Sequence, residues 1–277
     1  MSISASDVKK LRDMTGAGMM DSKKALTEAE GDFDKAVEIL RKKGQKVSEK
    51  RADREANQGL VLARVSEDGK KAAAIEINCE TDFVARNEDF QAKAESFLNA
   101  AYDNDATTTE ELLSQTVEGS TIADHLQNMT GTIGEKIQIS KAVLVTTNGT
   151  LISYIHPGAQ LGVLVEFDGD LTSSDIGKDV AMQVAAMKPI AVTQEEVDAS
   201  VVEKELEIAK EQLINEGKPE HIAEQAAKGK LRRFYEERVL LNQKFVKDNG
   251  VSVKDYLTQN DAPLVKSFHR LQLGENA

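Results

Sequence analysis

Residues 73–87 read Ala-Ala-Ile-Glu-Ile-Asn-Cys-Glu-Thr-Asp-Phe-Val-Ala-Arg-Asn, and the pattern changes within this segment. Residues 73–79 alternate as a β-strand does, whereas the segment from Phe90 to Ala101 repeats as an amphipathic helix does. The residues between them therefore form a strand-to-helix turn that presents Asp82 beside Phe83. The chain is only 4% aromatic, so an aromatic side chain at a turn is unusual. The pattern alone nevertheless favours Phe83 packing under its own helix.

Length and composition restrict the classes of protein to which this chain could belong. A length of 277 residues predicts about two domains, and 40% hydrophobic with 30% charged residues is normal for a soluble protein. No apolar run is long enough to span a membrane, and the N-terminus lacks the basic and apolar regions of a signal peptide. The single cysteine, Cys79, allows no internal disulfide and fits a reducing compartment. We therefore expect a cytoplasmic protein with no membrane partner.

The net charge of −12 argues against direct binding to nucleic acid. The exception is a basic run near the end of the N-terminal region, which could contact RNA. A solvated helix end and linker is the favoured interpretation, because acidic residues intervene and no aromatic side chains interleave for base stacking. The run comprises Arg41, Lys42, Lys43, Lys46, Lys50, Arg51 and Arg54.

Residues 1–45 are expected to form an N-terminal domain of three short helices. The two glycines of Thr15-Gly16-Ala17-Gly18 break the first helix, and Gly44 ends the third. A unit of this size has a small core and is typical of a binding module. Residues 46–57 are charged and have no apolar periodicity, so they are interpreted as a linker.

The next part of the chain is expected to be a core made of two similar halves, residues 58–138 and 139–192. A β-hairpin is predicted in the first half, with its turn at Glu67-Asp68-Gly69. In the second half, strands at 139–145 and 151–155 are expected to form a hairpin, followed by a strand at 161–167. The recurrence suggests a duplicated α+β unit, in which the loop at His156 corresponds to the loop that carries Phe83.

Residues 193–246 are expected to form an antiparallel helical hairpin that protrudes from the core. Its first helix has a short coiled-coil seam, and close packing of the returning helix is expected at Ile222, Ala226 and Gly229. Such a hairpin could mediate self-association. Residues 247–277 are expected to return to the core with a strand at 267–273. The seam is formed by Val202, Leu206, Ala209 and Leu213.

The sequence contains no evident catalytic or cofactor motif. No phosphate-binding glycine loop is present, and four scattered histidines with one cysteine have no metal-ligand spacing. Cys79 as a nucleophile would need a base that the sequence does not identify, so a strand cysteine is favoured. We therefore expect no cofactor, no metal site and no catalytic residues, and interpret the chain as an interaction protein rather than an enzyme.

Three motifs resemble those of one family, bacterial elongation factor Ts, the nucleotide exchange factor for elongation factor Tu (EF-Tu). In order they span nearly the whole chain, with support from Ile133-Gly134-Glu135 and Gly217-Lys218-Pro219. The three motifs are Leu11-Arg12 with Thr15-Gly16-Ala17-Gly18-Met19-Met20-Asp21, then Asn78-Cys79-Glu80-Thr81-Asp82-Phe83-Val84-Ala85, and finally His156-Pro157-Gly158-Ala159 with Leu161-Gly162-Val163-Leu164-Val165.

The resemblance implies an α+β fold: an N-terminal three-helix domain like ubiquitin-associated (UBA) domains, a duplicated core of small antiparallel sheets with helices, and a protruding antiparallel coiled-coil hairpin. It also implies a translation elongation factor that binds EF-Tu·GDP and promotes GDP release by disturbing the Mg²⁺ and phosphate site. The residues implied in displacing Mg²⁺ from EF-Tu are Thr81, Asp82, Phe83 and Val84. The residues implied in binding the partner are Arg12, Met19, Met20, His156, Gly158, Leu161 and Gly162.

Three features depart from the family pattern. Position 22 is Ser22 where some relatives carry cysteine, so no chemistry is assigned there. Pro157 changes the third motif, so the loop that carries it is expected to differ in shape from that of some relatives. The sequence stops soon after Gly274-Glu275, so the additional C-terminal helix of some members is not expected. Other functions stay open at this point: a UBA-like adaptor, a ribosome- or RNA-associated binding protein without exchange activity, or a thiol enzyme.

Overall fold

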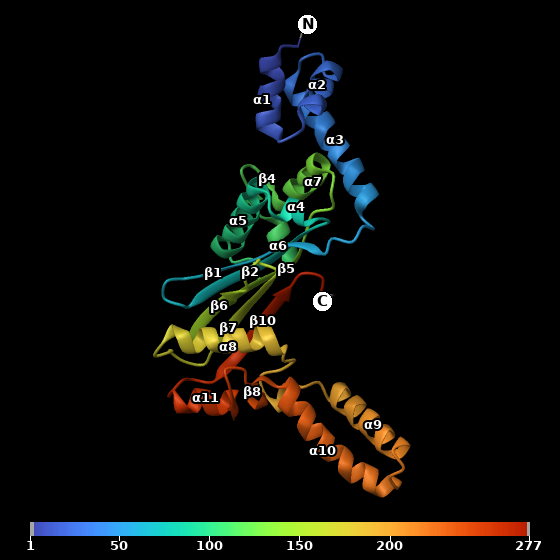
Figure 1. The fold of residues 1–277 in the computed structure, drawn as a ribbon. Helices are drawn as coiled ribbons and strands as arrows, with labels where there is room; N and C mark the ends of the chain where they lie inside the picture. Colours follow the sequence, from blue (N-terminus) through green and yellow to red (C-terminus); the bar gives the residue numbers. More distant parts are fainter. Residues whose placement is uncertain (1–2, 276–277) are drawn as a thin grey trace.

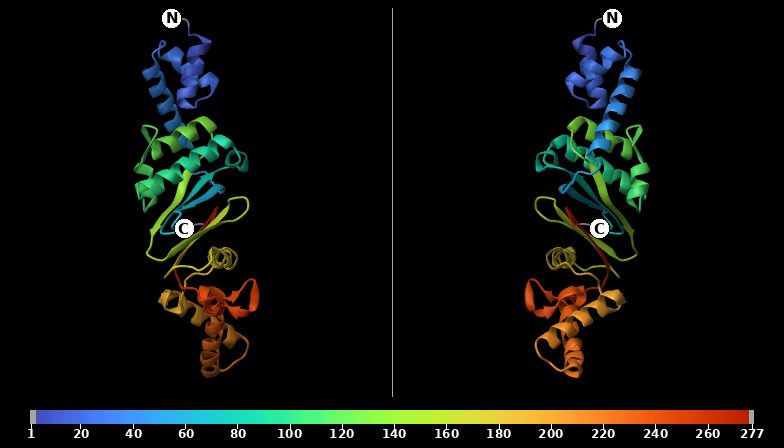
Figure 2. Two further views of the ribbon diagram at one scale, coloured as in Figure 1. Left: turned by 90° about the vertical axis from the view of Figure 1, so that its left-hand side faces the viewer. Right: turned by 90° about the vertical axis from the view of Figure 1, so that its right-hand side faces the viewer.

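The computed structural model describes residues 3–275, and these form an α+β protein with three visible parts. Figure 1 shows a helical unit at the N-terminal end, a central pair of sheets with helices, and a helical hairpin at the opposite end. The side views in Figure 2 show the same elongated order of parts. None of the helices within residues 3–275 is long and apolar enough to cross a membrane.

The N-terminal unit contains α1 (Ala5–Thr15), α2 (Met19–Glu28) and α3 (Phe33–Arg51). Ser4 caps α1, and Gly16 ends that helix in the left-handed region at φ 68°. Leu11 and Leu26 are fully buried in the core that the helices share. The three expected helices are therefore present.

The third helix is longer than expected. It continues through Gly44 to Arg51, so the prediction that Gly44 ends it is wrong, and the first part of the expected linker is helical. Gly44 is buried against Gly131 of α7 (Ile122–Ile133), and α3 packs along that helix. The glycine allows two helices to approach closely, a use that sequence does not distinguish from a helix stop.

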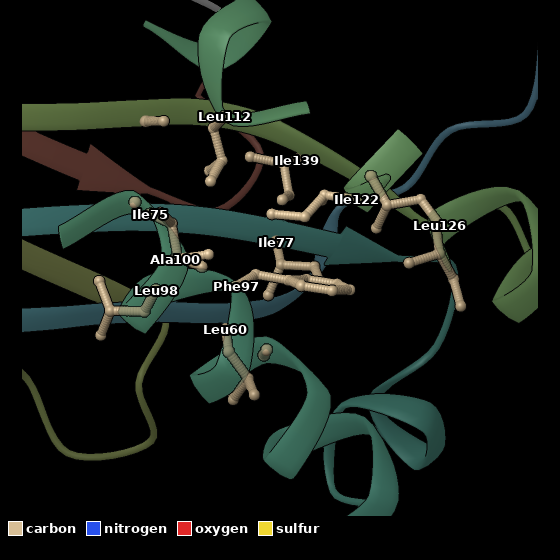
Figure 3. Packing of buried hydrophobic residues seen from close by; sticks show 14 of the residues in the cluster. Leu60, Ile75, Ile77, Phe97, Leu98, Ala100, Leu112, Ile122, Leu126 and Ile139 are labelled. Atoms are coloured by element: carbon tan, nitrogen blue, oxygen red, sulfur yellow. The ribbon is translucent and has the colours of Figure 1, made fainter. Parts of the chain in front are cut away.

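The first sheet is antiparallel and has the order β1 (Gln58–Val65), β2 (Lys71–Cys79), β5 (Gln138–Thr146). Helices α5 (Glu88–Asp103), α6 (Thr109–Ser114) and α7 cover one of its faces. Figure 3 shows Phe97 and Leu98 of α5 gathered with Ile75 and Ile77 of β2. Alternate β2 residues such as Ala74 lie in the core between the two sheets. Both faces of β2 are therefore buried.

The second sheet has the order β10 (Val265–Gln272), β7 (Leu161–Phe167), β6 (Thr150–Ile155) and is also antiparallel. Helix α8 (Ser174–Met187) packs on its outer face, and α11 (Val253–Gln259) joins the same buried cluster on the far side of α8. The two sheets meet through Val61, Leu151 and Leu164. The core is therefore a stack of helices, sheet, sheet and helices. The strand expected at 267–273 is confirmed within β10.

The expected hairpin between 139–145 and 151–155 is wrong. Strand β5 pairs with β2, with Ala142 opposite Ile75, and so belongs to the first sheet. Residues 139–145 were expected in the second half of the core, and the structure places them in the first sheet. Alternation shows which face a strand buries but not which strand it pairs with. Each half consists of a hairpin, a helical insertion and a third strand beside the hairpin's second strand.

This topology also changes the expected correspondence of loops. The turn at His156 joins β6 to β7, so its counterpart in the first half is the turn that joins β1 to β2. Phe83 instead follows the second strand of its half. The prediction that the loops of His156 and Phe83 correspond is therefore wrong.

Helices α9 (Ala199–Asn215) and α10 (Glu220–Arg238) form the antiparallel helical hairpin. Leu206, Ala209 and Leu213 pack against α10, as expected, whereas Val202 packs at the base of the hairpin. Ala226 packs in the seam with Ala223 and Ala227, but Ile222 and Gly229 are exposed. The remaining elements are α4 (Asp82–Ala85), β3 (Thr116–Val117), β4 (Ser120–Thr121), η1 (Gln194–Glu196), η2 (Leu240–Asn242), β8 (Lys244–Phe245) and β9 (Asp248–Ser252).

Candidate functional site

Phe83 is the most exposed large hydrophobic side chain of the described residues, at 82%. It lies on α4, a single helical turn that begins three residues after β2. Ala85 is buried and Val84 packs against the adjacent core, so the inner face of this turn is already occupied. Successive helical residues point about 100° apart, which turns Phe83 outward. The expectation that Phe83 packs under its own helix is therefore wrong.

The start of the turn is held by hydrogen bonds from outside it. The Thr81 backbone N–H donates to Glu135 Oε2 at 3.0 Å, and the Thr81 hydroxyl donates to Glu135 Oε1 at 2.7 Å. Asp82 forms an ion pair with Arg86 at 2.9 Å, one helical turn further on. The four residues expected to displace Mg²⁺ thus lie together: Thr81 is fixed, Val84 is half-buried, and Asp82 and Phe83 face outward.

The two residues that precede Thr81 have pKa values shifted in opposite directions. Burial alone would raise the pKa of Glu80, but the Lys136 backbone N–H and the Arg51 guanidinium hold the pKa of that carboxyl below its usual range. Burial raises the pKa of the Cys79 thiol to about 12, with the nearby Glu135 charge adding to the effect. Cys79 is fully buried, so it has neither the thiolate character nor the access that a nucleophile needs.

The turn from His156 to Leu161 is a tight reversal between β6 and β7. The Ala159 N–H donates to the His156 carbonyl at 2.9 Å, across Pro157 and Gly158. Gly158 has a φ of 91°, the conformation that a type II turn requires after proline. The His156 side chain is exposed, and its Nδ1 lies 2.9 Å from the Tyr154 hydroxyl oxygen. This turn presents an imidazole at a fixed position.

The structure brings this turn to the same end of the first sheet as α4. The Val61 N–H donates to the Ala159 carbonyl at 2.7 Å, which ties the turn to β1. Ala159 and Val84 both pack against the core cluster beneath the first sheet's helices. His156 and Gly158 are exposed, whereas Leu161 is half-buried and Gly162 is buried. A β-carbon on Gly162 would lie 2.5 Å from Val61 Cγ1, so this glycine serves the contact between the sheets.

Arg12, Met19 and Met20 lie apart from these turns, on the N-terminal helical unit. All three side chains are exposed, with Met19 at 48% and Met20 at 65%. Met14, which sequence reasoning did not select, is 59% exposed near the same glycine-rich turn. Its position outside the α1 core stripe of Val8 and Leu11 was the available signal. Exposed methionines of this kind are suited to an adaptable contact.

The described part of the chain contains no cluster of three or more His, Cys, Asp or Glu side chains that could hold a metal ion. A pocket of about 110 Å³ lies on the helical hairpin, lined by residues such as Ile208 and Phe234. A second, more open pocket lies beside Tyr102 at the β1–β2 turn. Neither includes a residue of α4 or of the His156 turn. The fold and site define a class: an α+β protein that presents an exposed aromatic side chain on a turn held by Glu135.

Comparison with known proteins specifies the family. The model of the family described as elongation factor TS matches residues 80–275. Elongation factor Ts of Amoebophilus asiaticus is 46% identical over 277 residues, covering 99% of this chain and 100% of that protein. The Christiangramia forsetii protein of the same name is 46% identical over 275 residues, with coverage of 98% and 99%. That of Aquifex aeolicus is 44% identical over 286 residues, with 99% of each covered.

The chain therefore belongs to the elongation factor Ts family. Its role is accordingly that of a translation elongation factor.

Proposed function

We propose that this chain is a guanine nucleotide exchange factor that binds EF-Tu·GDP and accelerates GDP release, after which GTP binds. The observation that carries the proposal is the 82% exposure of Phe83, beside Asp82, on a turn whose start is held by Glu135. A large apolar side chain kept in solvent by a fixed backbone is suited to enter a partner. The factor performs no covalent chemistry of its own and needs no cofactor.

The proposed mechanism acts on the partner's Mg²⁺ and phosphate site. A GTPase holds its nucleotide with backbone N–H groups, a lysine and Mg²⁺ that bridges the phosphates. Phe83 wedges between helices of the nucleotide-binding domain, and Asp82 disturbs the ordered water around the ion. Thr81 and Val84 hold these two side chains in place. Exchange is then a binding linkage: the factor lowers nucleotide affinity, and nucleotide lowers factor affinity by the same ratio.

Faster GDP release requires more than one contact between the factor and EF-Tu, because one buried side chain supplies too little free energy. A release that is 10⁴-fold faster needs a barrier lower by roughly 5.5 kcal/mol. Burying one Phe side chain contributes about 1.5–3 kcal/mol. The remainder comes from a second contact by His156 and Gly158, which Leu161 and Gly162 support from below. Arg12, Met19 and Met20 provide a third contact, an anchor on another helix of the partner.

The parts of the molecule have separate roles in this proposal. The N-terminal unit is a UBA-like docking domain whose last helix extends to Arg51. The duplicated core carries the Phe83 and His156 turns. The antiparallel hairpin, residues 193–246, is a coiled coil that contacts EF-Tu or a second copy of the chain. The factor works in the cytoplasm, without a membrane or nucleic acid partner.

The test is release of a fluorescent GDP analogue from EF-Tu with and without the full chain. Acceleration that rises to a plateau with factor concentration supports exchange. Binding to EF-Tu without faster release would overturn exchange and favour a UBA-like adaptor. No binding to EF-Tu, with salt-dependent binding of RNA to the basic run from Arg41 to Arg54, would instead favour the ribosome- or RNA-associated alternative.

A further inference from the structure

Two residues that sequence reasoning did not assign to the site meet just before the exposed turn. Arg51 ends α3, and its Nη1 donates to both carboxylate oxygens of Glu80, at 2.7 and 2.9 Å. Glu80 also accepts the Lys136 backbone N–H at 2.6 Å. The side chains are 33% and 18% exposed, so the pair is shielded more than an ordinary surface ion pair.

The next residue along the chain is held from a different element. Glu135 follows α7, which ends at Ile133 and is capped by Gly134 with a φ of 82°. Both of its carboxylate oxygens accept from Thr81, one from the backbone N–H and one from the hydroxyl. Glu80 and Thr81 are therefore held by the ends of two helices that are distant in sequence.

Those two helices are themselves joined. Gly44 of α3 and Gly131 of α7 pack backbone to backbone, as described above. The side chain of Lys136 donates to the carbonyls of Ala52 and Arg54, at 2.7 and 3.0 Å, and so fixes the chain that leaves α3. The N-terminal unit, α7 and the Phe83 turn are thus linked by a continuous set of contacts.

We propose that Arg51 and Glu135 are positioning residues for nucleotide exchange, which hold the Phe83 turn rigid and couple it to the N-terminal helical unit. This inference rests on the exchange function proposed above. In this proposal both residues act through the turn and not by touching the nucleotide or the partner's metal. Their effect is to order the turn before docking, so that little conformational entropy is lost when Phe83 enters the partner.

A positioning role predicts a change in the maximal rate of GDP release with little change in binding to EF-Tu, which a general loss of stability does not predict. The N-terminal unit and the His156 turn retain their contacts when the Phe83 turn loosens, so binding changes little. The wedge acts only when release occurs, so the maximal rate of GDP release falls. Arg51→Lys keeps a positive charge at this position but presents it as a point charge, and so restores part of the effect.

The first experiment uses the full chain alone and measures amide hydrogen exchange in residues 81–87, where Thr81 N–H and Arg86 N–H are both bonded. Arg51→Ala is expected to speed this exchange about tenfold, equivalent to about 1.4 kcal/mol. Glu135→Ala removes both acceptors of Thr81 and should have a similar effect. Lys50→Ala, an exposed change one residue earlier on α3, is the matched control and should leave the exchange unchanged.

The second experiment measures GDP release from EF-Tu over a range of factor concentrations. Arg51→Ala should lower the maximal rate about tenfold with the half-saturating concentration changed less than twofold, and Arg51→Lys should recover part of the rate. Unchanged amide exchange in Arg51→Ala, or faster exchange with a normal maximal rate, would overturn the proposal. If the unaltered chain did not accelerate GDP release from EF-Tu, the exchange function itself would fail. The amide exchange result would still decide whether Arg51 and Glu135 hold the Phe83 turn.

Discussion

Gly131 of α7 lies so close to Gly44 of α3 that a β-carbon on Gly131 would stand 2.4 Å from the Gly44 Cα. The contact is asymmetric, because a β-carbon on Gly44 would meet its nearest atom, the Gln127 carbonyl oxygen, at 3.6 Å. The first distance requires a backbone to move, whereas the second is ordinary van der Waals contact. The two glycines at one crossing therefore tolerate substitution differently.

Gly131→Ala should destabilise the packing of α3 on α7. Overpacking of a tight contact costs about 1–3 kcal/mol. The measurement is urea unfolding of the full chain, followed by amide exchange along α3 to locate the effect. Gly44→Ala is the matched control: it adds the same methyl group to a helix interior, where replacing glycine gains about 0.5–1 kcal/mol. Equal destabilisation by both substitutions would contradict the observed geometry.

The base of the helical hairpin depends on a pair of buried glutamines. Gln243 donates to the Glu237 and Met187 carbonyls and accepts from Gln183 at 3.1 Å, and both side chains are fully buried. Gln243→Ala removes these three hydrogen bonds from a buried site, which should cost about 1–3 kcal/mol. Scanning calorimetry measures the loss. Gln225→Ala, an exposed change on α10, should alter stability by less than about 0.5 kcal/mol. A Gln243→Ala protein as stable as this control would show that the network contributes nothing.

Cys79 should be inert in the folded chain. With a thiol pKa of about 12, roughly one molecule in 10⁴ carries the thiolate at pH 8, and burial blocks access to it. A thiol reagent at pH 8 should label the native chain negligibly and label one thiol per chain in strong denaturant. Native labelling at the denatured rate would contradict the burial and restore a thiol function as an alternative.

Sequence predicted the elements of this fold better than their partners. The strands expected at 73–79 and 161–167 are present, and the structure buries both faces of each. The partner of β5 was not predictable, since the same alternation suits pairing with β6 or with β2. Gly44 was misinterpreted for a related reason: a glycine in a helical pattern marks a stop or a close crossing, and only the approach of Gly131 decides between them.

In the candidate site, likewise, the sequence predicted the local element but not the contacts made by its side chains. The spacing placed Phe83 at a strand-to-helix turn, but its orientation depends on Val84 and Ala85 filling the inner face. Arg51 and Glu135 were out of reach, because they lie 29 and 54 residues from their partners Glu80 and Thr81 along the chain. Long-range ion pairs and hydrogen bonds have no local sequence pattern.

Phe83→Ala in stopped-flow release of a fluorescent GDP from EF-Tu, at saturating factor, tests the central claim most directly. The substitution removes about 1.5–3 kcal/mol of free energy gained by burying the Phe83 side chain in EF-Tu. This loss predicts a maximal rate of GDP release lower by roughly 10- to 150-fold. Affinity for nucleotide-free EF-Tu, measured alongside, should fall by a smaller factor because the other contacts remain. A wild-type rate of GDP release in Phe83→Ala would contradict the account.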